Sequence, residues 1–363
     1  MQMIIDSHCD LAWNMLNYGR DYTRSAAETR KLEKDSIVPE KNGDSLIGWP
    51  DYQRGQVAIV FSTLFASPAR LKEGDWDKQC YATFDEARRL YLDQIHLYHD
   101  LADSKPDLFR LIQNKPELHG HLQEWRDASK KERPVGLVIL MECADAIREV
   151  DELAEWYDLG LRIIGPAWSG NRYTGGTREP GPLTDDGRAL LRAMADFNFV
   201  LDLSHMDEQA ALDALDFYDG PIIASHVNCL ALLPGFPTNR HFSDRVLRGV
   251  IERDGVVANV PLNSFLKSGW NRKSGSRREE VPLDILAAHM DHVCQLAGDS
   301  RHAGIGSDFD GGFGVQSVPP EIDTVADLHK LVPLLKARGY SETDTANILG
   351  LNWAGFLDKN LPS

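Results

Sequence analysis

The stretch Met3-Ile4-Ile5-Asp6-Ser7-His8-Cys9-Asp10 joins an apolar run directly to a group of ionisable and sulfur-bearing side chains. Further runs rich in Val, Ile and Leu follow along the chain, and several of them also end in His, Asp or Glu. Uninterrupted apolar runs of this length are typical of parallel strands that are buried on both faces. We expect eight strands, at residues 3–7, 56–64, 135–141, 161–167, 199–204, 221–225, 255–261 and 303–307.

Amphipathic stretches lie between these runs and predict helices. The clearest are residues 85–102, 144–157, 185–197, 207–217 and 283–296. Strands that alternate with helices indicate βα units, and eight such units favour a closed barrel over an open, doubly wound sheet. The sequence therefore predicts an α/β fold, a (β/α)8 TIM barrel.

The length of 363 residues also fits one barrel, because barrels of about 250 residues often carry insertions. Two polar connections, residues 17–55 and 267–280, would be long βα-loop excursions of this kind. The charge run at residues 30–35 is more typical of a solvated face, although its position leaves a lid or an interface role open. We predict a single barrel domain over residues 1–363.

Composition excludes several classes of partner. The formal net charge of −16 argues against nucleic acid, because phosphate binding needs clustered Lys and Arg. The five cysteines are scattered without a CxxC spacing, which argues against both a disulfide framework and a cysteine-built zinc site. The first apolar run is too short for a signal peptide or a membrane span. We expect a cytoplasmic protein that binds neither nucleic acid nor membrane.

Ionisable residues mark the ends of several predicted strands. In a (β/α)8 barrel the carboxyl ends of all strands surround one mouth, where active sites lie. His8 and Asp10 are two residues apart, so in extended chain both side chains project from one face and can ligate the same ion. The other strand-end candidates are Glu142, His205, His226 and at least one of Asp308 and Asp310.

Each candidate taken singly has a plainer interpretation. A strand-end histidine is more often a hydrogen-bonded structural residue than a ligand, and a lone His-x-Asp motif is weak. Glu142 closes an apolar strand, where a buried charge is costly unless it is paired or bound to a metal. The barrel brings all these strand ends to one mouth, so a single site explains the whole set. The pattern therefore predicts a metal site there.

With these pieces in place, the chain resembles the membrane dipeptidase (renal dipeptidase) family of zinc peptidases, within the amidohydrolase-like barrels. The resemblance extends from Asp6 to Asn352, and the order and spacing of its pieces make it more specific than any one of them. Its His-x-Asp motif, in place of the His-x-His of many barrel hydrolases, points to this family. The other matching pieces are Glu142, Asp202-Leu203-Ser204-His205, Ser225-His226, Arg240 and Asp308-Phe309-Asp310-Gly311.

The resemblance implies two Zn²⁺ ions per chain. His8 and Asp10 would bind one ion and His205 and His226 the other, with Glu142 and a water or hydroxide bridging the pair. Asp308 resembles the aspartate of the eighth strand that handles the proton of this water, and Asp310 is the less favoured alternative. Arg240 resembles the arginine that holds the terminal carboxylate of the substrate; its alternative is a surface residue at a helix start.

One departure from the family bears on substrate preference. Where the renal enzyme has a substrate-contacting histidine after the fourth strand, this chain has Trp168. An indole N–H can donate one hydrogen bond but cannot take a positive charge. Asn171, Arg172 or Tyr173 would then be substitutes that contact the substrate, or Trp168 would serve in packing alone.

The resemblance implies a metallo-dipeptidase that hydrolyses the amide bond of dipeptides with a free C-terminal carboxylate, including dipeptides with a D residue there. Two other readings stay open. One is a related metal hydrolase acting on N-acyl amino acids, lactams or lactones, and the other is a metal-binding barrel without turnover. The expected partner is the small dipeptide, and a homodimer is compatible with the large loops.

Overall fold

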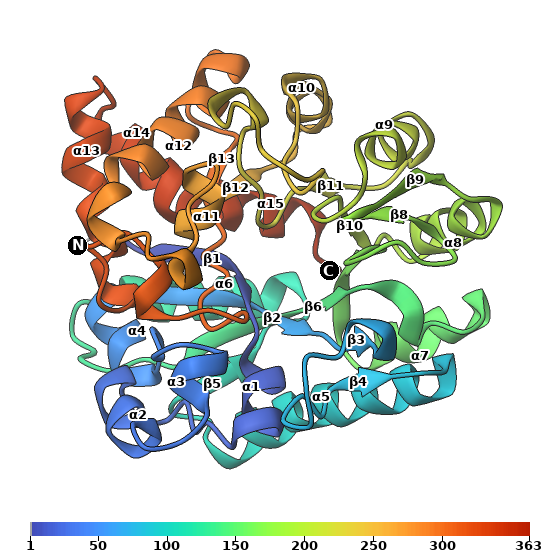
Figure 1. Ribbon diagram of the computed structural model, residues 1–363, viewed down its shortest axis with the longest axis horizontal. Helices are drawn as coiled ribbons and strands as arrows, with labels where there is room; N and C mark the ends of the chain where they lie inside the picture. The colour runs from blue at the N-terminus through green and yellow to red at the C-terminus, as the bar shows by residue number, and fades with distance from the viewer. Residues whose placement is uncertain (1) are drawn as a thin grey trace.

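A computed structural model describes residues 2–363. Its centre is a set of parallel strands, with helices arranged around them (Figure 1). Eight strands form the central ring, one at each predicted position: β1 (Ile4–Cys9), β2 (Val57–Leu64), β6 (Val135–Glu142), β7 (Leu161–Gly165), β10 (Val200–Asp202), β11 (Ile222–Ile223), β12 (Val257–Asn259) and β13 (Ala303–Ile305).

The strands are hydrogen-bonded in the order β11-β10-β7-β6-β2-β1-β13-β12. The two ends of this series meet through one parallel bridge between Ala224 and Val257. Two hydrogen bonds hold it: Ala224 N donates to Val256 O at 3.0 Å, and Ala258 N donates to Ala224 O at 2.9 Å. The ring is therefore nearly closed, and the predicted (β/α)8 barrel is confirmed.

Burial explains why the longest runs form strands. Every residue of β2 and of β6 is buried, because one face of each strand fills the barrel and the other packs under the helices. The surrounding helices are α1 (Leu11–Tyr18), α2 (Ala26–Glu33), α3 (Val38–Lys41), α4 (Trp49–Gly55), α5 (Phe84–Ser104), α6 (Lys115–Arg126), α7 (Leu153–Asp158), α8 (Asp185–Asp196), α9 (Glu208–Phe217), α10 (Asp244–Glu252), α11 (Asn263–Leu266), α12 (Asp284–Ala297), α13 (Leu331–Ala337), α14 (Glu342–Ala346) and α15 (Asn352–Asn360).

The predicted helix at residues 144–157 is wrong in its first half. Only Leu153–Asp158 is α-helical, after two short 3₁₀ turns at Ala144–Ala146 and Val150–Glu152. Cys143 leaves β6 with a left-handed φ of 71°, which turns the chain sharply at the strand end. Asp145 is then buried and accepts a hydrogen bond from Tyr81 Oη at 2.5 Å. A tertiary contact thus replaces the amphipathic helix.

The first excursion, residues 17–55, folds into α2, α3 and α4 and is tied to the loop after β13. Arg20 is buried, with Nη1 2.8 Å from Asp310 Oδ2 and Nε 2.9 Å from Glu33 Oε1. Ser45 Oγ also donates to Asp310 Oδ2 at 2.8 Å. The excursion is therefore an ordered part of the barrel rim.

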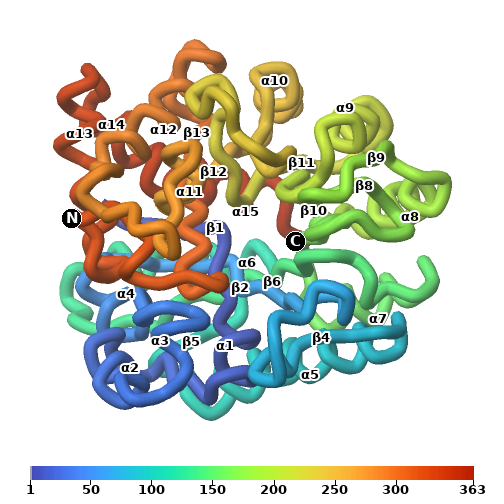
Figure 2. The backbone as a smooth tube through the Cα atoms, in the orientation of Figure 1, coloured from blue at the N-terminus to red at the C-terminus, as the bar shows by residue number. Residues whose placement is uncertain are grey.

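Smaller strand pairs and the C-terminal helices complete the molecule. The smaller strands are β3 (Ser67–Pro68), β4 (Cys80–Tyr81), β5 (Phe109–Leu111), β8 (Thr174–Gly176) and β9 (Glu179–Leu183). The N-terminal end of the chain lies beside α13 and α14 (Figure 2), where Gln2 Nε2 donates to Thr345 Oγ1 at 3.0 Å. Asn352 donates to the carbonyl of Ala303 at 2.8 Å, so the start of α15 covers the amino end of β13. Among residues 2–363, no helix combines the length and apolarity of a transmembrane span.

The burial of His121, in α6, predicts that the native barrel loses stability in acid. It is fully buried, its Nε2 donates to Ala58 O at 2.8 Å, and its Nδ1 has no hydrogen-bond partner among the described residues. Burial lowers its pKa to about 4, whereas the unfolded chain has a value near 6.5. The unfolded state therefore binds the proton first, and stability present above pH ~6.5 is lost as the pH falls toward ~4.

Urea unfolding between pH 7.5 and 4.5 measures this loss. His121 alone should contribute up to about 3 kcal/mol of it, since one pKa unit is worth about 1.4 kcal/mol. His121→Gln keeps a donor for Ala58 O but cannot titrate. The free energy of unfolding of this variant should therefore decrease less than that of the wild type as the pH is lowered. Parallel curves for the two proteins would contradict this account.

Candidate metal centre

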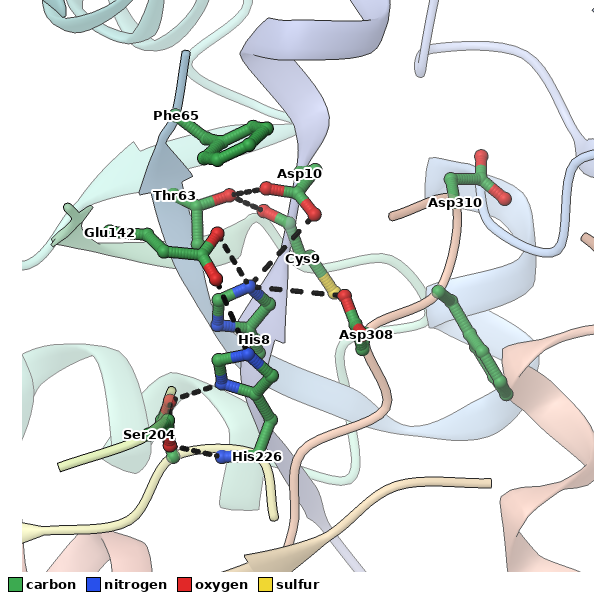
Figure 3. A network of polar contacts seen from close by, with 12 residues as sticks. His8, Cys9, Asp10, Thr63, Phe65, Glu142, Ser204, His226, Asp308 and Asp310 are labelled. Atoms are coloured by element: carbon green, nitrogen blue, oxygen red, sulfur yellow. Dashed lines mark hydrogen bonds and ion pairs between the residues drawn. The ribbon is translucent and has the colours of Figure 1, made fainter. Parts of the chain in front are cut away.

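Six side chains predicted from the sequence converge at the carboxyl ends of the strands. They come from five places in the barrel: the end of β1 and the residue after it, the end of β6, and the loops after β10, β11 and β13. The residues are His8, Asp10, Glu142, His205, His226 and Asp308. Figure 3 shows three of the carboxylates directed at the ring of His8.

His8 lies at the centre of the acidic side chains. Its Nε2 is 3.9 Å from Asp10 Oδ2, 3.6 Å from Glu142 Oε2 and 3.9 Å from Asp308 Oδ1. Burial lowers its pKa, but the negative charges of Glu142, Asp10 and Asp308 outweigh burial and raise it to about 10. Both ring nitrogens lack a hydrogen-bond partner among residues 2–363. The three acidic side chains attract positive charge, either as a proton on this ring or as a metal ion bound to its neutral form.

Glu142 lies between two groups of histidines. Its Oε2 faces His8, whereas its Oε1 is 2.9 Å from His205 Nε2 and 3.4 Å from His226 Nε2. Burial alone would raise the pKa of Glu142, but His8 and His205 lower it well below its ordinary value. Each carboxylate oxygen thus faces a different set of nitrogen ligands, which is the arrangement a bridging carboxylate requires.

The donor atoms fit metal ions. His205 Nε2 and His226 Nε2 are 3.0 Å apart and lie 2.9 and 3.4 Å from Glu142 Oε1, so these three donors are close enough to bind one zinc at about 2.0–2.1 Å. Two further sets of three donors are also close enough to hold an ion: His8 with Glu142 and His226, and His8 with Asp10 and Asp308. Imidazole and carboxylate ligands of this kind suit zinc.

Asp308 and Asp310 have different surroundings. Asp308 and Asp310 both have a left-handed φ, of 57° and 65°, but only the carboxylate of Asp308 reaches the cluster. Burial raises its pKa well above the ordinary value, opposed by His8 and reinforced by Asp10. Asp310 lies apart from the cluster in Figure 3 and accepts hydrogen bonds from Tyr22, Ser45 and Leu46. The structure thus brings Asp308, and not Asp310, to the site.

Arg240 is hydrogen-bonded to the backbone of His226, and part of its guanidinium has no hydrogen-bond partner among the described residues. It is 2% exposed, and its Nη2 donates to His226 O at 2.8 Å. Its Nε and Nη1 have no hydrogen-bond partner in the described part of the chain, and its guanidinium carbon is 5.2 Å from the centre of the Phe265 ring. Burial lowers the pKa of Arg240, partly offset by Asp308 and Glu142. A carboxylate could accept a hydrogen bond from one of these two donors.

The three other predicted substrate contacts differ in place. Trp168 is half-buried beside the cluster, its ring centre 5.1 Å from that of Phe65 and 6.4 Å from that of His205. The side-chain amide of Asn171 is already hydrogen-bonded within its own loop. Its Nδ2 donates to Pro166 O, and its Oδ1 accepts from Tyr173 N and Thr174 N. Tyr173 is buried and donates to Ile147 O. Only Trp168 is brought to the cluster, and substrate contact by the other two stays a prediction.

Three residues with hydroxyl side chains also contact the cluster, and none of them was a candidate from the sequence. Thr63 Oγ1 donates to Asp10 Oδ1, Thr177 Oγ1 is 3.0 Å from His205 Nδ1, and Ser225 Oγ is 2.7 Å from His226 Nδ1. Ser225 was visible only as the neighbour of His226. Thr63 lies near the end of β2, but β7 and β12 also end without an ionisable residue, so no signal in the sequence singled out Thr63.

Gly311 lets Asp308 and Asp10 approach each other. A Cβ at this position would lie 2.2 Å from Asp308 Oδ1 and 2.6 Å from Asp10 Oδ2. Any side chain here would therefore displace one of the two carboxylates.

A (β/α)8 barrel with histidines and carboxylates gathered at the carboxyl ends of its strands defines a metal-dependent hydrolase. Comparison with known proteins identifies the family. The sequence model of the membrane dipeptidase family, peptidase family M19, matches residues 1–358. The chain belongs to this family of metallo-dipeptidases, as its sequence motifs predict.

Individual relatives agree with this assignment. The dipeptidase verJ of Clonostachys rogersoniana is 28% identical over 313 residues, which cover 84% of this chain and 73% of the relative. The crystal structure of a dipeptidase AC, a metallopeptidase of family M19, superposes with a TM-score of 0.77 at 25% identity, covering 100% of this chain and 99% of the other. A metallopeptidase of Rhodobacter sphaeroides, solved with a phosphinate mimic of the dipeptide L-Ala-D-Ala, gives 0.76 at 24% identity, covering 99% and 100%.

Proposed function

We propose that this metallo-dipeptidase uses two zinc ions to hydrolyse dipeptides that end in a free carboxylate, including those with a D residue at that end. The position of Glu142 carries the proposal. One of its oxygens faces His8 and the other faces His205 and His226, so two ions could share this carboxylate. His8 and Asp10 would complete one site, and His205 and His226 the other.

Zinc bound there supplies Lewis acidity, which makes a water more acidic and stabilises negative charge on the carbonyl oxygen of the substrate. The chain's own residues do the remaining work. Asp308 accepts a proton from the attacking water at a carboxylate oxygen and returns it to the leaving amine. Arg240 binds the terminal carboxylate through a guanidinium donor that lacks a partner among residues 2–363.

A second candidate function is hydrolysis of N-acyl amino acids. Trp168 favours it, because its half-buried ring and that of Phe65 lie together beside His205 and offer an apolar surface. An acyl chain has no amino group to recognise, so such a surface would suit it. Both candidates share the metal ligands and the carboxylate contact.

Protein stripped with a chelator and reloaded with zinc tests the proposal. We expect two equivalents of zinc per chain and turnover of L-X-L-X and L-X-D-X dipeptides, the D series being included because of the ligand in the Rhodobacter sphaeroides structure. His226→Gln should lose one equivalent and most activity. The matched control is His302→Gln, which replaces a half-buried histidine bonded to Gly255 O at 2.8 Å.

The outcomes separate the candidates. Turnover of N-acyl amino acids without turnover of dipeptides would favour the second candidate over the first. Binding of a single equivalent by the wild-type chain, or loss of zinc from His302→Gln as from His226→Gln, would contradict the ligand assignment.

A further inference from the structure

Behind His226 lies a short chain of buried hydrogen bonds. Ser225 Oγ is 2.7 Å from His226 Nδ1 and 2.5 Å from Asp202 Oδ2. The other oxygen of Asp202 accepts from Ser204 N at 3.0 Å and from Ser225 N at 2.9 Å. Asp202 and Ser225 are each at most 2% exposed. Asp202 therefore receives three hydrogen bonds, two from backbone N–H groups and one from the Ser225 hydroxyl.

The direction of each hydrogen bond follows from the one proton that Ser225 Oγ carries. Ser225 donates this proton to Asp202 Oδ2. Ser225 Oγ must then accept from the His226 ring, so Nδ1 of His226 carries the proton. The other nitrogen, Nε2, is left with a free lone pair, and it is the nitrogen that lies 3.0 Å from His205 Nε2 and 3.4 Å from Glu142 Oε1.

We propose that Asp202 and Ser225 are positioning residues that fix His226 in the Nδ1–H tautomer. In this tautomer the lone pair of Nε2 is free to bind a metal ion. The proposal rests on His226 being a zinc ligand, as proposed above. Ligand histidines commonly donate their second ring N–H to a carboxylate, a carbonyl or a water, and here a serine hydroxyl stands between ring and carboxylate. The backbone fixes the orientation further, because Arg240 Nη2 holds His226 O.

A second aspartate–serine pair in the same barrel serves as the matched comparison. Ser307 N and Ser307 Oγ donate to the buried Asp6 at 2.7 and 2.5 Å, just as Ser225 does to Asp202. No hydrogen bond joins the Ser307 hydroxyl to a histidine ring within the described residues, and His8 Nδ1 has no partner there. Removing the hydroxyl of Ser225 or of Ser307 therefore takes one hydrogen-bond donor from a buried aspartate. Only Ser225 is also hydrogen-bonded to a proposed metal ligand, His226.

The test has two readouts, neither of which is turnover. In zinc-free protein labelled with ¹⁵N-histidine, long-range ¹⁵N–¹H spectra report the ring tautomer, and His226→Gln identifies the signal. We expect the Nδ1–H form in the wild type and a loss of this preference in Ser225→Ala. Zinc competition with a chromogenic chelator should show affinity at one of the two sites lowered by roughly 10–100-fold in Ser225→Ala and Asp202→Asn. Ser307→Ala should bind zinc as the wild type does.

Each outcome separates this proposal from the one on which it rests. If His226→Gln kept both zinc ions at wild-type affinity, the ligand assignment itself would fail. If His226→Gln lost an ion while Ser225→Ala and Asp202→Asn bound zinc normally, only the positioning role would fail. The wild-type tautomer needs no variant to fold, and an Nε2–H ring in the zinc-free wild type would overturn the proposal directly.

Discussion

Asp308→Asn is expected to keep both zinc ions and to lower kcat by roughly 10²–10⁴-fold, the usual contribution of a general base. The amide is nearly isosteric with the carboxylate but cannot accept the proton. Exposure singles out Asp308 among the acids of the cluster: its side chain is 14% exposed, against 7% for Asp10 and 7% for Glu142. It is therefore the carboxylate that a substrate entering from the barrel mouth can reach.

Steady-state kinetics with zinc analysis of the same samples measure the effect. Asp310→Asn is the matched control, because it changes an aspartate two residues away that pairs with Arg20 and accepts from Leu46 N. That variant should lose stability and keep its kcat per folded molecule. Near-normal turnover in Asp308→Asn, or loss of zinc that accounts for the whole decrease, would remove Asp308 from the proposed mechanism.

Arg240→Met should lower kcat/KM for a free dipeptide roughly 30- to 5000-fold. This corresponds to a loss of about 2–5 kcal/mol of binding energy, as expected when one partner of a buried charged pair is removed. Methionine approximates the length of the side chain without its charge. The same variant should hydrolyse a dipeptide amide about as well as the wild type does, because the amide has no carboxylate to bind. The difference between the two substrates isolates the carboxylate contact from any disturbance of His226 O.

An exposed arginine at the same rim provides the control. Arg178 lies beside Asn239, its backbone N donating to Asn239 Oδ1 at 2.8 Å, and its side chain is exposed. Arg178→Met should leave both substrates unaffected. A decrease in Arg240→Met of equal size for the free dipeptide and the amide would mean that Arg240 supports the metal site and does not bind the carboxylate.

The strands and the ionisable cluster were predictable from sequence because both are local patterns. A strand buried on both faces needs an unbroken apolar run, and an acid or a histidine at its end is conspicuous. His8, Glu142 and His226 could be grouped without coordinates, since a closed barrel brings all its strand ends together. The choice of Asp308 over Asp310 also agrees with where the structure brings each side chain.

The remaining features depend on partners distant in sequence. Ser225 is an ordinary residue until Asp202 and the His226 ring are both beside it, and Thr63 gains its role from Asp10, 53 residues away. The turns after Glu142 could not be predicted from periodicity, because the burial of Asp145 against Tyr81 decides them. Asn171 is an exception, because its partners Pro166 and Tyr173 are near in sequence, but only the structure shows that the loop uses its amide.

The closure of the barrel has a consequence for its cohesion. β10, β11 and β12 are only two or three residues long, and the ring closes between β11 and β12 through a single bridge. This arc has fewer paired residues between its strands than the arc of β1, β2 and β6, so it is the less strongly joined of the two. Ions held jointly by Glu142 of β6, His205 after β10 and His226 after β11 would cross-link the weaker arc to the stronger one. The same ligand bonds would then serve both hydrolysis and the integrity of the ring.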